Sequence, residues 1–130
     1  MGRVHINSCD FSVASYSFDD VDGDFELKRF DMNVQHDVTS GMIGMMTEAT
    51  TTAKYSWPET KDEGLRIFAS PWSPPAWMKK PTEVDPPGST HAVNMTGSDL
   101  PNCLRDGVGP TSRYAAAWAL YFSKFITACK

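Results

Sequence analysis

A cluster of three prolines constrains this chain more than any other feature of its sequence. They lie within five residues of one another, at Pro71, Pro74 and Pro75. A proline lacks a backbone donor and pushes the residue before it toward extended backbone, so the cluster excludes a helix or a central strand. The apolar run before it, residues 65–69, has the composition of a buried strand. We therefore predict a stiff loop at a strand end.

This loop carries two tryptophans. Trp72 directly follows the predicted strand, and a stiff loop lowers the cost of ordering an aromatic face before a ligand arrives. Flat aromatic faces suit the C–H faces of sugar rings, so we predict that Trp72 is a binding residue. For Trp77 the sequence leaves two roles open, that of a buried core residue and that of a binding residue.

Composition is typical of one small soluble domain. The chain has 130 residues, of which 41% are hydrophobic and 22% charged, and this balance argues against disorder. No apolar run approaches the roughly 20 residues of a membrane helix, and residues 1–5 contain no apolar segment typical of a signal peptide. The net charge is -4 without a cluster of lysines and arginines, so no nucleic-acid partner is expected.

No metal-binding pattern is visible, and we expect neither a metal nor a cofactor. The three cysteines are widely spaced and form no zinc motif with any histidine. We interpret Cys9, Cys103 and Cys129 as thiols, mostly buried, with a single bridge left open. The acidic loop at residues 11–30 fails as a calcium loop, because Gly23 at the sixth position places Phe18 at the first ligand position.

Periodicity predicts the order strand, loop, helix, strand, loop, helix. The first strand is predicted over residues 3–10 and ends at Asp10. Its side chains alternate with a period of two, since Val4, Ile6 and Ser8 alternate with Arg3, His5, Asn7 and Cys9. A weak helix is expected over residues 37–54, capped by Asp37 and interrupted by glycines. Prolines and glycines exclude a long regular element over residues 80–110.

The last helix is the clearest element. It is capped by Thr111 or Ser112 and is expected to run to Lys130. Its apolar stripe consists of Tyr114, Trp118, Tyr121, Phe122, Phe125 and Cys129.

Two strands joined by a crossover helix should be parallel, and parallel strands are normally buried on both faces. These two would be covered on one side only, so we interpret the chain as an internal slice of a larger α/β protein. In such proteins the chemistry sits at the carboxyl ends of the strands. Asp10 and Trp72, at the ends of the two predicted strands, should therefore meet on one rim.

Several long motifs resemble glycoside hydrolase family 30, and within it the glucosylceramidases. They read RVHINSCDFS at residues 3–12, YSFDD at 16–20, DFEL at 24–27, ASPWSPPAWMK at 69–79 and WALYFSKFI at 118–126. The likeness covers most of the chain and is weakest over residues 35–64. His5 stands where the family usually has proline.

The resemblance implies that residues 1–130 are part of a (β/α)8 TIM-barrel catalytic domain, comprising about two βα units, the second and third. The other strands and a side β-domain would be absent. In this family Asp10 would hydrogen-bond sugar hydroxyls, Trp72 would line the same glucose pocket, and Arg3 would support the site. The two catalytic carboxylates belong to the fourth and seventh strands, so no catalytic residue is expected here.

The resemblance further implies a β-glucoside or glucosylceramide substrate, lipid contact at a membrane surface, and a secreted or lysosomal parent protein. Asn94 begins a glycosylation sequon that has meaning only in a secreted protein. Two other readings stay open. One is a β-1,6-glucanase or xylanase of the same family, and the other is a binding or interaction module without chemistry.

Overall fold

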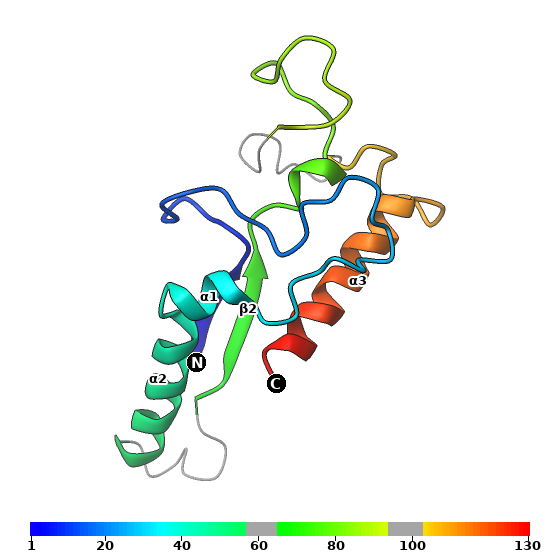
Figure 1. The fold of residues 1–130 in the computed structure, drawn as a ribbon. Helices are drawn as coiled ribbons and strands as arrows, with labels where there is room; N and C mark the ends of the chain where they lie inside the picture. Colours follow the sequence, from blue (N-terminus) through cyan, green and yellow to red (C-terminus); the bar gives the residue numbers. More distant parts are fainter. Residues whose placement is uncertain (57–64, 94–102) are drawn as a thin grey trace.

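A two-stranded parallel sheet lies at the centre of the computed structural model, which describes residues 1–56, 65–93 and 103–130 (Figure 1). Strand β1 spans Gly2–Ile6 and strand β2 spans Ile67–Pro71, and they pair in register from Gly2↔Ile67 to Ile6↔Pro71. The predicted parallel pairing is confirmed, but the second strand lies two residues later than predicted, includes Pro71, and is not buried, since Phe68, Ala69 and Pro71 are exposed. The first strand is shorter than predicted, because Asn7 adopts a left-handed backbone with φ 66° and turns the chain before Asp10.

The weak helix predicted between the strands is in fact two helices. Helix α1 spans Gln35–Thr39 and helix α2 spans Met42–Ser56, separated at Gly41, whose φ of 81° ends the first helix. Asp37 lies inside α1 and is buried, so its predicted capping role is wrong. Asp31 takes that role, because its carboxylate accepts the backbone N–H groups of Asn33 and Gln35.

Helix α3 spans Arg113–Ala128 and starts as predicted, with the Ser112 hydroxyl accepting the N–H of Ala115. It ends at Ala128, two residues before the predicted end, with Cys129 as its C-cap. The proline loop contains one short 3-10 helix, η2, at Ala76–Met78, where no helix was expected. An antiparallel bridge between Lys79 and Leu104 joins this loop to the segment before α3.

The core lies between α3 and the loop that follows β1. Figure 1 shows this loop running alongside α3, and aromatic side chains from both fill the space between them. Phe18 and Phe30 of the loop contact Tyr121 of α3, with ring centroids 6.4 and 4.8 Å apart. Trp77 is also buried in this core, which settles its open role. The predicted stripe of α3 is confirmed except at Cys129, which is exposed, since its five aromatic residues lie in or against this core.

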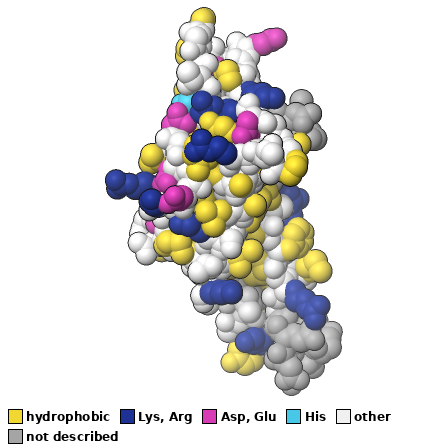
Figure 2. All heavy atoms as spheres, turned by 90° about the vertical axis from the view of Figure 1, so that its right-hand side faces the viewer, with side chains coloured by type: hydrophobic (Ala, Val, Ile, Leu, Met, Phe, Trp, Pro, Cys, Tyr) yellow, Lys and Arg dark blue, Asp and Glu magenta, His cyan; other side chains and the backbone are white. Residues whose placement is uncertain are grey.

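The two faces of the sheet differ in burial. Val4 and Ile6 point to the buried side, whereas Arg3 and Phe68, which are register partners, are exposed on the other side. Viewed from the α3 side, hydrophobic side chains reach the surface among charged ones (Figure 2). Leu120 and Ile126 of α3 belong to the exposed apolar residues.

Cysteine states follow the prediction only in part. All three are free thiols, with Cys103 buried, Cys9 half-buried and Cys129 exposed. Within the described ranges no three acidic, histidine or cysteine side chains are grouped to hold a metal ion. The helices of these same ranges are too short or too polar to cross a membrane.

Candidate functional site

The carboxyl end of the sheet carries both predicted sugar-binding residues. Trp72 immediately follows β2 and is 39% exposed, although its neighbour Ser73 is buried. Asp10 is exposed in a turn beyond the end of β1, so it projects from a loop and not from the strand itself. Neither side chain makes a hydrogen bond or ring contact in the part of the chain that the structure describes. Both are therefore available to a ligand at this end of the sheet.

Arg3 links the two strands on the exposed face of the sheet. Its Nε donates to the Ser70 hydroxyl over 2.9 Å. Ser70 follows Phe68, the register partner of Arg3, by two positions and therefore lies on the same face of β2. This bond fixes the guanidinium on the exposed face of the sheet, before the carboxyl end of β2 (the rim), where the loop with Trp72 begins. Arg3 can therefore support the site without being at the rim.

A buried polar network lies directly beneath Trp72. The Asn7 amide donates from Nδ2 to the Ser73 carbonyl over 3.2 Å, and Lys79 donates from Nζ to the Ser73 hydroxyl over 2.9 Å. Asn7 in turn accepts the Tyr121 hydroxyl at Oδ1 over 2.5 Å. Asn7, Lys79 and Tyr121 are each 0% exposed. The end of β1, the proline loop and α3 are thus joined by hydrogen bonds shielded from water.

A second network surrounds His5. The Tyr16 hydroxyl donates to Asp37 Oδ1 over 3.0 Å, so its oxygen accepts the Nε2–H of His5 over 3.2 Å. This pattern assigns the Nε2–H tautomer to His5. The Tyr16 ring also stacks on His36, with centroids 3.4 Å apart. Burial raises the pKa of Asp37, against the hydrogen bonds from Tyr16 and His36 that lower it. Burial and the adjacent Asp37 raise the pKa of Tyr16.

Asp19 is a buried carboxyl group with an unusual titration. It is 3% exposed, and its Oδ1 accepts the N–H of Val21 over 3.1 Å, while Oδ2 lacks a partner among the described residues. Burial raises its pKa to about 6, a value suited to acid–base chemistry. Its backbone carbonyl accepts the Trp77 indole over 3.0 Å. Because the carboxyl is enclosed in the core, we assign it no role in catalysis.

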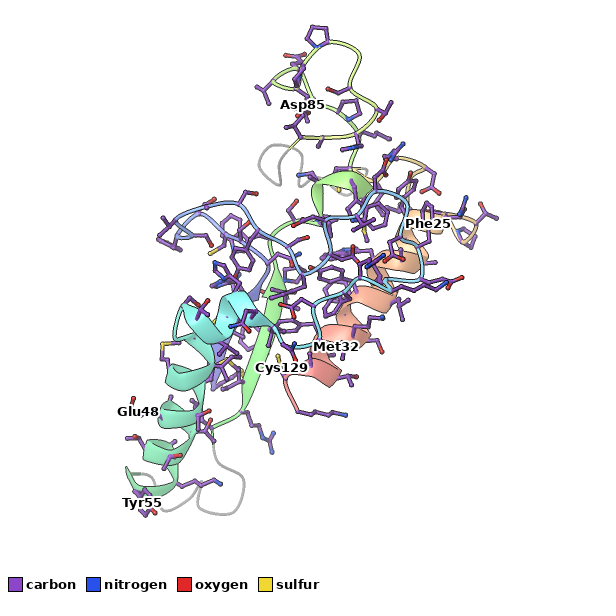
Figure 3. All side chains as sticks on the ribbon, in the orientation of Figure 1. Phe25, Met32, Glu48, Tyr55, Asp85 and Cys129 are labelled. Carbon is purple, nitrogen blue, oxygen red and sulfur yellow. The ribbon has the colours of Figure 1, made fainter. Side chains whose placement is uncertain are left out.

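Two hollows lie among the described residues, and the first of them borders Tyr16 and Trp77. One of about 260 Å³ is lined by Ser15, Tyr16, Asp20, Ala76, Trp77, His91 and Val93. A second of about 430 Å³ lies between α2 and the end of α3, over Ile67 of β2. Figure 3 shows Glu48 and Tyr55 of α2 pointing away from the rest of the molecule, whereas Phe25 lies against the start of α3. Phe25 contacts Tyr114 there, with centroids 5.0 Å apart.

Sequence reasoning did not identify Asn7, Lys79 or Tyr121 as parts of one network. Asn7 and Tyr121 are 114 positions apart, and local patterns contain no information on such contacts. One signal was available for Asn7, since asparagine tolerates the left-handed backbone that ends a strand. Asn94 falls outside the described residues, so its glycosylation stays a prediction.

Comparison with known proteins gives matches along the whole chain. Residues 1–130 match the family model for the glycosyl hydrolase family 30 TIM-barrel domain. "Putative glucosylceramidase 4" of Caenorhabditis elegans is 35% identical over 127 residues, which cover 98% of this chain and 20% of that protein. Lysosomal acid glucosylceramidase of Mus musculus is 29% identical over 126 residues, which cover 97% of this chain and 19% of that protein.

A glucanase is similar as well. An endo-1,6-beta-D-glucanase of Aspergillus fumigatus is 30% identical over 118 residues, which cover 89% of this chain and 20% of that protein. The chain thus spans about a fifth of the length of these curated relatives.

Proposed function

This chain belongs to glycosyl hydrolase family 30, and we propose that it forms the second and third βα units of a retaining β-glucosidase that acts on glucosylceramide. The intact protein would release glucose and ceramide, in a secreted or lysosomal compartment and in contact with lipid at a membrane surface. Within it, these residues contribute part of the pocket for the glucose ring.

The observation that carries this proposal is the placement of Trp72 and Asp10 beyond the carboxyl ends of two paired parallel strands. That end of a barrel is where substrates bind in TIM-barrel enzymes. An exposed indole offers a flat face to the C–H groups of a sugar, and an ionised carboxylate accepts sugar hydroxyls in charge-assisted hydrogen bonds. Together they match the two kinds of group on a glucose ring, its C–H groups and its hydroxyls.

The chemical step itself would depend on groups outside these residues. Retention requires two carboxyl groups about 5–5.5 Å apart, one as acid and base and the other as nucleophile. Asp19 and Asp37 are the carboxyl groups with a raised pKa among the described residues, and both are buried away from the rim. We therefore place the catalytic pair on the fourth and seventh barrel strands, as the family resemblance implies.

A β-1,6-glucanase is the second candidate function, favoured by the similarity to the fungal enzyme. Glucosylceramidases rank first because a relative with that name is 35% identical over 98% of this chain, whereas an endo-1,6-beta-D-glucanase of Neurospora crassa that aligns over the same share is 28% identical. Both candidates use a retaining mechanism on a β-glucoside. They differ in the group that leaves.

A substrate panel on the intact protein separates the two. Purified protein is incubated with glucosylceramide in detergent micelles and with β-1,6-glucan, and proton NMR records the first anomer released. We expect glucose from glucosylceramide, appearing first as the β-anomer. Release of oligosaccharides from the glucan alone would establish the second candidate, and a first α-anomer would exclude a retaining mechanism.

A further inference from the structure

We propose that Asn7 and Lys79 are positioning residues that fix Trp72 by holding the next residue, Ser73, from two sides. This inference rests on the proposed function only for the role of Trp72 as a sugar contact. The positioning itself is a property of the structure. The proposal gives a role to two buried residues, Asn7 and Lys79, that make no direct contact with the proposed pocket.

The first step is that Ser73 is held at both of its oxygen atoms. Its carbonyl accepts Asn7 Nδ2 over 3.2 Å, and its hydroxyl accepts Lys79 Nζ over 2.9 Å. The same hydroxyl donates to the Pro74 carbonyl over 3.0 Å. Hydrogen bonds shielded from water are electrostatically stronger than exposed ones, and a bond from a charged ammonium group is stronger again. Ser73 is therefore a fixed point in the loop.

The second step concerns the orientation of the Asn7 amide. Tyr121 accepts the Phe18 backbone N–H over 2.6 Å, so the Tyr121 hydroxyl hydrogen is free to be donated to Asn7 Oδ1. The Asn7 nitrogen then has to face the Ser73 carbonyl. Three consecutive hydrogen bonds, from Phe18 to Tyr121, from Tyr121 to Asn7 and from Asn7 to Ser73, thus connect the core at α3 with the residue beside Trp72.

The third step is that packing is the other restraint on the Trp72 side chain in the described part of the chain. No hydrogen bond or ring contact holds its side chain, and 39% of the residue is exposed. Its position is therefore set by the backbone on either side, β2 before it and Ser73 after it. Loss of the bonds to Ser73 should free the indole without disturbing the core.

Fluorine NMR tests this directly in the intact protein labelled with 5-fluorotryptophan, with the Trp72 signal assigned from Trp72→Phe. Lys79→Met removes the ammonium group. Asn7→Asp keeps the acceptor for Tyr121, replaces the amide donor to Ser73 by a second carboxyl oxygen and, when ionised, adds a negative charge at this buried position. Lys124→Met is the control, because Lys124 also donates a hydrogen bond from its ammonium group, but it is half-buried and its acceptor is the Leu27 carbonyl, away from Trp72.

We expect the Trp72 signal to shift and sharpen in Lys79→Met and Asn7→Asp, while the signals of Trp77 and Trp118 stay in place. KM for an aryl β-glucoside should rise about three- to tenfold, the equivalent of one hydrogen bond, with kcat nearly unchanged. Lys79→Arg, which keeps a charged donor, should restore much of the loss. Lys124→Met should leave the Trp72 signal unmoved.

An unchanged Trp72 signal in both folded variants would overturn the proposal, as would a uniform shift of all tryptophan signals, which indicates a general structural role. If Lys79→Met does not fold, Asn7→Asp decides by the same criterion. A shifted Trp72 signal with unchanged KM would support the positioning and instead remove Trp72 from the proposed sugar pocket.

Discussion

At the scale of single residues, burial decides how the acidic side chains of this chain behave. Asp85 is half-buried and accepts backbone N–H groups from Val93 and Thr82, which hold its pKa below the usual range. Asp19 also accepts a backbone N–H, but burial outweighs that bond and raises its pKa to about 6. Similar local bonding thus gives opposite pKa shifts, and the difference lies in solvent access.

This contrast predicts a pH-dependent effect of Asp19→Asn. The folded pKa of Asp19 lies above its ordinary value of 3.8, so the folded state binds the proton more tightly than the unfolded state. Stability should then fall as pH rises from about 4 to about 6. The amide of the variant would not titrate. We expect the variant to melt higher than the native protein above about pH 6 and to lose that advantage at about pH 4.

Differential scanning calorimetry of the intact protein across this pH range provides the check. Asp20→Asn, at the exposed neighbouring position, is the control. An advantage of Asp19→Asn that stays constant with pH would show that Asp19 keeps its ordinary titration.

At the scale of elements, two glycines three positions apart have opposite roles. Gly41 has φ 81° between α1 and α2, whereas Gly44 lies inside α2, and neither would place a new Cβ within 4 Å of another atom. Gly41→Ala should therefore destabilise by about 1 kcal/mol through backbone strain alone. Gly44→Ala should stabilise by roughly 0.5–1 kcal/mol through helix propensity. Urea unfolding of both variants in the intact protein measures these changes in the free energy of unfolding. If both variants were destabilised, or both stabilised, the assigned break in the helix at Gly41 would be contradicted.

The same elements show how far sequence patterns reach. Proline spacing predicted the loop at Trp72, because it acts through local backbone chemistry, and the crossover helix between the two strands predicted their parallel pairing. The pattern did not resolve the break at Gly41, since a glycine inside a periodic segment can continue or end a helix. It also extended β1 to Asp10, because the turn at Asn7 depends on buried partners on the proline loop and α3.

At the scale of the whole molecule, the sheet is buried on one face only. Its two strands pair with each other, and Arg3 and Phe68 on the unburied face are exposed. Two strands alone are only marginally stable in water. We therefore expect the 130-residue chain by itself to lack a sharp thermal transition and to associate through its exposed apolar side chains.

The isolated chain should also have no glycosidase activity, because we propose that the catalytic carboxyl pair lies on other strands. Incubation with an aryl β-glucoside and with glucosylceramide checks this. Turnover that copurifies with the chain, or a monodisperse monomer with a cooperative transition, would show that these residues form a complete unit.

The proposed glucose pocket is tested most directly by the kcat/KM of Asp10→Ala and Trp72→Ala in the intact protein, measured with glucosylceramide. Val13→Ala, in the same exposed loop as Asp10, is the control. Loss of a charged hydrogen bond to a sugar hydroxyl corresponds to about 1.5–3 kcal/mol, so Asp10→Ala should lose about ten- to a hundredfold in kcat/KM. Trp72→Ala removes the aromatic face and should also lower kcat/KM, and neither variant should change the melting temperature. Values close to those of the native protein in both variants would contradict the account and remove this end of the sheet from the sugar site.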